Sequence, residues 1–162
     1  LNVISTMGDD GADGDHDRLF TYGGRSMSIL DEDGRLVFDT GAQIEELTAQ
    51  FDPLSFNMDN ADPSSVDDRS DNKGPEPEGV TVGEVRGTTY AFLGAERSGG
   101  VYAFDLEARR ESARFAGYLS TRPADLGPEG LRFISAQDSP TRKPLVLVTN
   151  EITGTIAIIQ VD

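Results

Sequence analysis

The stretch PEGVTVGEVRGTTYAFLGAERSGGVYAFDL (77–106) decides the fold, because its pattern returns as PEGLRFISAQDSPTRKPLVLVTNEITGTIAIIQV (128–161). In each copy a Pro-Glu-Gly triplet opens a short apolar run, and a second apolar run follows. A glutamate then begins the turn into a third run. Apolar runs bounded by glycine-rich turns are typical of antiparallel strands. A recurrence after about 50 residues matches the period of a propeller blade.

The repeat therefore predicts an all-β fold, with propeller blades of antiparallel strands. We expect three blade-sized units at 1–51, 79–127 and 128–162, and a long acidic, proline-rich loop at 52–78. Propellers close with about four to eight blades, and three would leave open edges. We therefore expect an incomplete ring, a fragment of a larger propeller. The N-terminal remainder of the same propeller, or another chain, would complete it.

The first unit matches the other two only in its strand pattern. Its strand-like runs are LNVIS (1–5), LFTY (19–22), SMSIL (26–30) and RLVFD (35–39). The Asp33-Gly34 pair between the last two runs predicts a hairpin turn. Thr40 and Gln43 have the spacing of a capping box, which predicts a short helix before the long loop.

The charge of the chain restricts its partners. Its 162 residues include 29 acidic and 14 basic side chains, which gives a net charge of −15. A surface this acidic repels nucleic-acid phosphates and anionic lipids and attracts cations, so no nucleic acid partner is expected. The sequence has no cysteine and no apolar run of about 18 residues, so disulfides and a direct membrane span are not expected either.

A first candidate calcium site lies in the acidic loop at 7–17. Asp13, Asp15 and Asp17 have the D-x-D-x-D spacing that lets alternate carboxylates converge on one hard cation. Calcium takes about six to eight such oxygen ligands. The loop is not an EF-hand, because Gly24 stands where the twelfth-position glutamate would be. The alternative is an acidic, solvated turn without an ion.

A second candidate metal site comes from glutamates that flank the repeated strands. Glu78 and Glu129 lie at the start of the first strand of a unit, and Glu96 and Glu151 follow the second strand. Because these strands are antiparallel, the four carboxylates would gather at one mouth of a central channel. Their mutual repulsion would require a cation or a basic partner. The alternative is that each glutamate accepts backbone hydrogen bonds in its own turn.

Two cations in the long loop are candidate catalytic residues. Arg69 and Lys73 lie shortly before Glu78, so the loop would deliver them to the same mouth. Calcium together with arginine and lysine could grip a phosphate ester and neutralise its transition state. The alternative is that both cations form salt bridges with nearby acids. A covalent triad, a P-loop and a zinc motif are absent, and the single histidine is His16.

The motifs YGGRSMSI, DRSDNKGPEPEGV and DLGPEGLRFISAQDSPTRKPLVLVTNEITGTI resemble the C-terminal part of the choice-of-anchor I family. That family comprises secreted or surface-anchored bacterial propellers, similar to esterase-like phytase domains and sometimes called alkaline phosphatases. The resemblance covers nearly the whole chain and implies a longer parent protein. By similarity to the phytase-like propellers, Glu78, Glu129, Lys73 and Arg69 would lie near calcium and phosphate.

Two functions follow as hypotheses. The first is a secreted or cell-surface, calcium-binding propeller that binds or hydrolyses phosphoesters of a phosphorylated small molecule at the channel mouth. If it is an enzyme, it would be a metal-dependent phosphoesterase in which metal-activated water attacks and Lys73 and Arg69 stabilise the phosphoryl charge. The second is a non-catalytic adhesion or scaffold module in which calcium only rigidifies loops.

Overall fold

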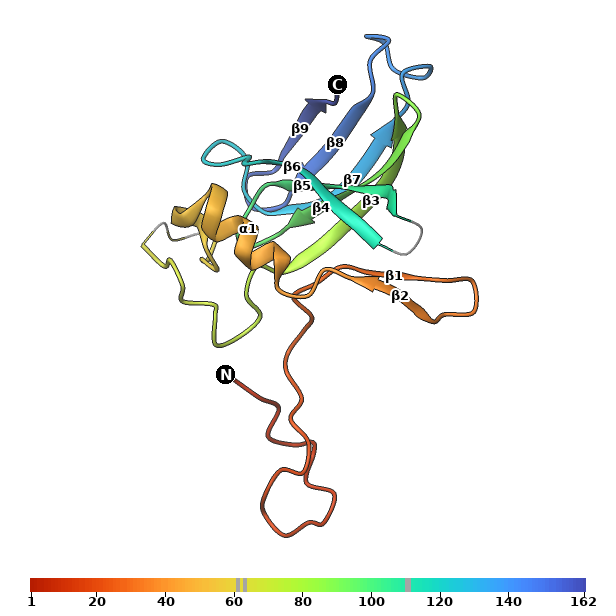
Figure 1. Ribbon diagram of the computed structural model, residues 1–162. Coiled ribbons are helices and arrows are strands. Elements are labelled where there is room, and N and C mark those ends of the chain that lie inside the picture. Colours follow the sequence, from red (N-terminus) through yellow and green to blue (C-terminus); the bar gives the residue numbers. More distant parts are fainter. Residues whose placement is uncertain (61, 63, 110–111) are drawn as a thin grey trace.

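A computed structural model describes residues 1–60, 62, 64–109 and 112–162 (Figure 1). Every strand pairing in this part of the chain is antiparallel. Its helices are α1 (Gln43–Phe51) and the 3-10 turn η1 (Pro53–Ser55), and neither is long and apolar enough to cross a membrane. The predicted all-β class is confirmed. No sheet closes on itself among the described residues, and the ring of blades and its unit boundaries stay predictions.

The larger of the two main sheets is a meander that begins with the first copy of the repeat. It contains β3 (Pro77–Val85), β4 (Thr88–Ala95), β5 (Val101–Arg109) and β6 (Ser112–Leu119), paired in that order. Arg86 and Gly87 join β3 to β4 with φ values of 53° and 84°. Two successive positive values are the requirement of a type I′ hairpin turn, whose twist matches that of the strands.

The second copy of the repeat forms a three-stranded meander of β7 (Pro128–Ile134), β8 (Leu145–Asn150) and β9 (Thr155–Gln160). The two meanders meet along their first strands, β3 and β7 (Figure 1). A hydrogen bond from the Phe133 backbone N–H to Thr81 Oγ1, 3.1 Å long, joins these two strands. The Pro-Glu-Gly triplets therefore open neighbouring strands, as the repeat predicts.

Two glycines of β3 allow this close approach. A Cβ atom at Gly83 would lie 2.2 Å from the Phe133 ring, and one at Gly79 would lie 2.1 Å from the Glu129 carbonyl oxygen. Both distances are far below van der Waals contact. Glycine at these positions therefore lets the backbone of β3 pack directly against β7.

Hydrophobic residues fill both faces of the larger sheet. Between the two meanders, Phe92 stacks on Phe133 with ring centroids 5.9 Å apart, beside the buried Val146 and Val148. The opposite face packs against α1 and the hairpin of β1 (Ser28–Leu30) and β2 (Leu36–Asp39). The largest buried residue of this face is Tyr102. Burial raises the pKa of Tyr102 to about 12, and its hydroxyl lies 2.6 Å from that of Thr48.

The predicted hairpin and helix are present, but the predicted capping box is wrong. β1 (Ser28–Leu30) pairs with β2 (Leu36–Asp39), and Gly34 in the turn has a φ of 78°. Ala42 precedes the first residue of α1 and makes no side-chain cap. Thr40 cannot cap the helix, because its hydroxyl accepts a hydrogen bond of 2.8 Å from the Met27 N–H and so anchors the hairpin.

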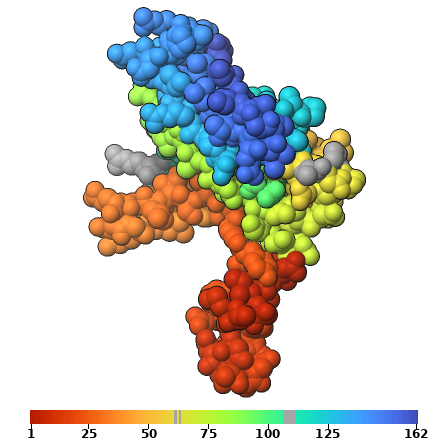
Figure 2. Space-filling model, turned by 180° about the vertical axis from the view of Figure 1, so that it is seen from behind, coloured from red at the N-terminus to blue at the C-terminus, as the bar shows by residue number. Residues whose placement is uncertain are grey.

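The strands predicted at 1–5 and 19–22 are wrong, since none of residues 1–27 belongs to a strand. These segments instead close the N-terminal loop, through backbone hydrogen bonds from Ile4 to Phe20 and from Arg18 to Gly8. They project away from the sheets as a separate lobe (Figure 2). With no neighbouring strand and no sheet face to bury, an apolar run of this length gains little from a strand conformation.

The segment at 52–78, predicted to be a long loop, contains a series of turns in its described residues (52–60, 62 and 64–78), and Arg25 holds its later part. The Arg25 guanidinium donates to the carbonyls of Ser70 and Asn72 over 2.7 and 3.1 Å, and it pairs with Glu45 of α1 at 2.8 Å. Asn57 also donates to Glu45, over 2.7 Å. Polar side chains make these contacts, so the sequence shows no apolar periodicity that would predict them.

We predict that Gly83→Val lowers the free energy of unfolding by about 1–3 kcal/mol, because the new side chain forces Phe133 out of its place between the sheets. Urea unfolding measures the change. The control is Gly117→Val on β6, where a Cβ atom has no neighbour within 4 Å. Equal stability of the two variants would contradict the close β3–β7 contact.

Candidate functional site

The site is built around the backbone of Glu76, which lies between two prolines. Glu76 has a φ of 50° and is 4% exposed. A left-handed conformation is unusual for a glutamate, and the following Pro77 disfavours it further. The turn after β4 stabilises it, because the Glu96 N–H donates to the Glu76 carbonyl over 2.8 Å and the Arg97 N–H donates to the Pro75 carbonyl over 3.2 Å.

Three carboxylates converge at this turn. Glu76, Glu78 and Glu96 each offer one oxygen, and these oxygens lie within 4.8 Å of one another. Glu76 and Glu96 are buried, whereas Glu78 at the start of β3 is exposed. Glu151, in the turn after β8, forms a side-chain hydrogen bond with Glu96. Residues from both meanders therefore meet at one end of the sheets.

Three cations compensate part of this negative charge, and they concentrate on Glu76. Arg69 forms a salt bridge with Glu76, and Lys73 Nζ lies 3.1 Å from its other carboxylate oxygen. Arg97 Nε lies 3.5 Å from Glu76, while Arg97 Nη2 lies 3.0 Å from Glu96. Glu76 is thus the buried counter-ion shared by all three cations, Glu96 also pairs with Arg97, and Glu78 forms no salt bridge among the described residues.

The pKa of Glu96 is raised above its ordinary value of 4.5. Burial is the largest cause, since it disfavours the charged carboxylate. Arg97 acts in the opposite direction, whereas the hydrogen bond that protonated Glu96 donates to Glu151 and the charges of Glu78 and Glu151 raise the pKa further. The cluster therefore holds a proton more tightly than an isolated glutamate does.

A second set of contacts fixes the turn that carries Glu96 and Arg97. The Arg122 guanidinium donates to the Arg97 carbonyl over 2.7 Å, to the Ser98 carbonyl over 3.0 Å and to Asn60 Oδ1 over 3.0 Å. Asn60 in turn donates to the Glu96 carbonyl over 2.6 Å. The pKa of Arg122 is lowered, and burial of the guanidinium is the largest cause. These bonds position the acidic side chains without touching their carboxylates.

A cavity of about 160 Å³ opens beside the carboxylates. Lys73, Glu76 and Glu78 line one part of it, and the chain at 22–24, including the Tyr22 side chain, lines another. A water molecule in liquid occupies about 30 Å³, so the cavity has room for a hydrated cation or a small polar group. Oxygen-only ligands of this kind suit calcium, which accepts carboxylates and water at flexible angles.

The structure brings some of the predicted metal ligands together and leaves others apart. Glu78 and Glu96 belong to the converging group, and Glu151 contacts Glu96 without belonging to that group among the described residues. Glu129 is exposed at the start of β7, and among the described residues it does not belong to the converging group. Its backbone carbonyl lies next to Gly79 at the β3–β7 contact.

The acidic loop at 7–17 forms no group of three converging carboxylates in the described part of the chain. Asp17 instead accepts a backbone hydrogen bond of 2.9 Å from Asp10. A calcium role for Asp13, Asp15 and Asp17 therefore stays a prediction.

The two predicted catalytic cations, Arg69 and Lys73, both pair with Glu76, and their catalytic role stays a prediction. This is the salt-bridge arrangement that the sequence left as the alternative. Sequence analysis missed Glu76 and Arg97 as site residues. The signal for Glu76 was a second carboxylate two positions before Glu78, between two prolines. No pattern pointed to Arg97.

Comparison with known proteins gives two similar relatives. "Gigasin-3a" of Magallana gigas is 33% identical over 172 aligned positions, which cover 92% of this chain and 60% of the relative. "Mesenchyme-specific cell surface glycoprotein" of Strongylocentrotus purpuratus is 34% identical over 91 positions, which cover 48% of this chain and 12% of the relative. The chain thus spans only part of each. No solved structure matches it.

The family of the chain follows from a match to the model of the choice-of-anchor I domain over residues 1–109. This range contains the N-terminal lobe, the hairpin, α1, the acidic turn at Glu76 and β3 to β5. The family and the cell-surface relative indicate an extracellular or cell-surface module. Because the match extends over well more than half of the 162 residues, the chain belongs to the choice-of-anchor I domain family.

Proposed function

We propose that this chain is an extracellular or cell-surface module in which a calcium ion binds at the glutamate cluster and fixes the two meanders to each other. The convergence of Glu76, Glu78 and Glu96 within 4.8 Å carries the proposal. Extracellular calcium sites of modest affinity need only a few carboxylates, completed by water and carbonyl oxygens.

The ligands that fit best are Glu78, which forms no salt bridge among the described residues, Glu96, whose basic partner is Arg97, and Glu151 beside Glu96. Glu76 has three basic partners, so it contributes mainly as their counter-ion. Glu78, Glu96 and Glu151 come from the start of β3, the turn after β4 and the turn after β8. A cation shared by these three would cross-link the two meanders at the end where their first strands begin.

This arrangement favours the non-catalytic module over the phosphoesterase. A phosphoryl group needs cations that are free to bind its oxygens. Arg69 is 16% exposed and shares Glu76 with Lys73, which is 40% exposed. Both would have to leave a buried carboxylate unpaired in order to reach a substrate, and breaking a buried pair costs about 3–5 kcal/mol. Their catalytic role and a phosphorylated ligand stay predictions.

We predict that calcium raises the melting temperature of the chelator-treated protein and that Glu96→Gln abolishes this shift. At about one hundred times its Kd, calcium adds about 2.7 kcal/mol to the free energy of unfolding. Thermal melts with and without calcium measure the effect. Glu129→Gln is the matched control, since Glu129 is exposed and lies outside the cluster, so this variant keeps the full shift. An unchanged shift in Glu96→Gln would overturn the site.

The pH dependence provides a second prediction. The pKa of Glu96 is raised in the folded state, so its stabilising contribution is present below pH 4.5 and is lost as pH rises through the folded pKa. In chelator, Glu96→Gln should therefore gain stability relative to the native protein between pH 4.5 and pH 7. Urea unfolding of both proteins across this range measures the difference. A constant difference would show that Glu96 titrates normally.

A phosphoesterase assay separates the two functions. We expect no calcium-dependent hydrolysis of p-nitrophenyl phosphate by the native protein, because its two candidate cations are paired. Hydrolysis that depends on calcium and is lost in both Lys73→Gln and Glu96→Gln would contradict the non-catalytic proposal.

A further inference from the structure

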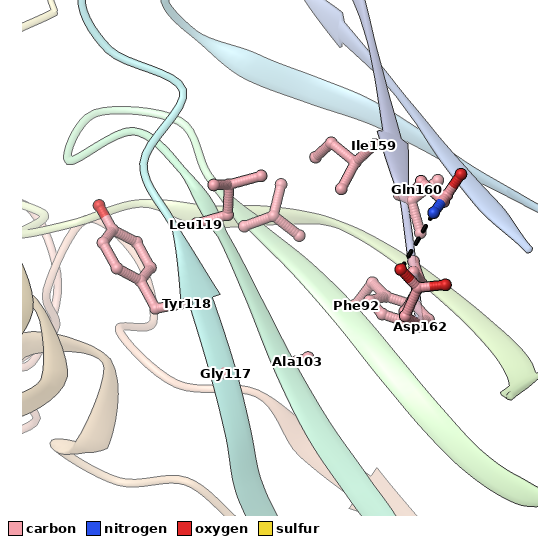
Figure 3. A pocket seen from close by; sticks show the side chains of 11 residues that line it. Phe92, Ala103, Gly117, Tyr118, Leu119, Ile159, Gln160 and Asp162 are labelled. Atoms are coloured by element: carbon pink, nitrogen blue, oxygen red, sulfur yellow. Dashed lines mark hydrogen bonds between the residues drawn. The ribbon is translucent and has the colours of Figure 1, made fainter.

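Asn150 is a buried polar residue at the end of β8. It is 2% exposed, and it follows Val146 and Val148, whose side chains lie in the apolar cluster between the two meanders. Because alternate residues of a strand share one face, the Asn150 side chain also points toward the larger sheet. Figure 3 shows the apolar character of this region, where Phe92 and Ile159 line a pocket of about 250 Å³ formed by both sheets. An amide buried beside such side chains requires polar partners.

Only one end of the Asn150 amide has such partners. Its Nδ2 donates to the Val148 carbonyl over 3.3 Å and to Thr155 Oγ1 over 3.4 Å. A backbone carbonyl only accepts hydrogen bonds, so the nitrogen and not the oxygen must face Val148. The oxygen Oδ1 lies on the other side of the amide, is buried and accepts no hydrogen bond among the described residues. With two lone pairs, this oxygen is able to accept from water or to bind a cation.

The corresponding position of the first meander shows that the fold does not need this amide. Glu151 follows Asn150 as Glu96 follows Ala95 at the end of β4. In both turns the glutamate N–H donates to the carbonyl of the residue before the Pro-Glu-Gly triplet, over 2.8 and 2.9 Å. Ala95 is fully buried in apolar packing. A small apolar side chain therefore suits this place in the architecture, and the asparagine of the second meander indicates a polar role.

Asn150 lies at the same end of the sheets as the glutamate cluster. Its partner on β7 is Pro128, and a Cβ atom at Gly94 of β4 would lie 3.3 Å from the Pro128 carbonyl oxygen. Gly94 is two residues before Glu96. The Glu96 carboxylate forms a hydrogen bond with Glu151, which directly follows Asn150. The unpaired oxygen is therefore held where the carboxylates of the two meanders meet.

We propose that Asn150 Oδ1 is a further ligand of the cation at the glutamate cluster. This inference rests on the proposed function, because it needs a cation shared by Glu78, Glu96 and Glu151. Calcium takes about six to eight oxygen ligands and accepts amide carbonyls beside carboxylates. A neutral oxygen adds a ligand without adding to the repulsion among the three carboxylates. It also ties the interior of the second meander to the cation.

This ligand makes the site selective for calcium over magnesium. Magnesium demands a near-ideal octahedral shell, keeps several of its waters and uses only one or two carboxylates. Calcium accepts more oxygens at more variable angles. An amide oxygen fixed by the backbone of β8 joins the irregular shell of calcium more readily than the octahedral shell of magnesium. Loss of this oxygen should therefore cost more calcium affinity than magnesium affinity.

The test compares the native protein with Asn150→Ala by isothermal titration calorimetry. We expect calcium to bind Asn150→Ala about tenfold more weakly and magnesium to change much less. Terbium(III) then replaces calcium, and its luminescence lifetimes in H₂O and D₂O count the bound waters, which should increase in Asn150→Ala. Unchanged calcium affinity, an equal loss for both metals or an unchanged water count would overturn this inference alone. Absence of calcium binding by the native protein would overturn the proposed function as well.

A matched variant and a measurement on the native protein separate a ligand from a structural residue. Thr155→Val removes one partner of Asn150 Nδ2 but leaves Oδ1, so it should keep the native calcium affinity. A loss as large as that of Asn150→Ala would assign the effect to packing and overturn the inference. In the native protein, calcium should shift the NMR resonance of the Asn150 side-chain carbonyl carbon. An unchanged resonance at saturating calcium would overturn the inference whether or not the variants fold.

Discussion

The close contact between β3 and β7 is the constraint on which the rest of the structure depends. Gly79 and Gly83 let the two backbones approach to a distance that no side chain would allow. This contact aligns the starts of both meanders, so the turns that follow β4 and β8 come to the same end of the molecule. Glu96 and Glu151 meet there only because the first strands are in register. The contact between Glu96 and Glu151 is therefore a consequence of strand packing, whereas Glu76, Glu78 and Glu96 converge within the first meander and the turn before it.

Charge balance decides what the site can do. Two unit charges 4.8 Å apart repel by about 3.5 kcal/mol at an effective dielectric constant of about 20. Arg69, Lys73 and Arg97 remove this repulsion for Glu76. Repulsion remains between Glu96 and the carboxylates of Glu78 and Glu151. A proton shared between Glu96 and Glu151 reduces this repulsion, and a bound cation would reduce it too. The three cations lower the negative charge at the carboxylates, and the pairing with Glu76 occupies Arg69 and Lys73.

Periodic features could be predicted from the sequence, and features made by single polar contacts could not. The repeated Pro-Glu-Gly triplets predicted β3 and β7, because alternation and turn residues act locally. Strand direction predicted that Glu78 and Glu96 lie at one end of their sheet, but it also predicted Glu129 there, which lies outside the converging group among the described residues. Glu76 was missed because its burial depends on a left-handed backbone that the turn after β4 stabilises. The capping box failed for a similar reason, since the hairpin had already engaged the hydroxyl of Thr40.

The position of the smaller sheet relative to the larger one decides which carboxylates can share a cation. The β3–β7 contact brings the turn after β8 beside the turn after β4, where the side chains of Glu96 and Glu151 form a hydrogen bond. Under the proposed function, a cation bound at Glu78 and Glu96 would also attract Glu151, and so would hold the β8–β9 turn close to the start of β3. Because a ligand that binds only one arrangement of the sheets stabilises that arrangement, calcium would then strengthen the contact between the two meanders.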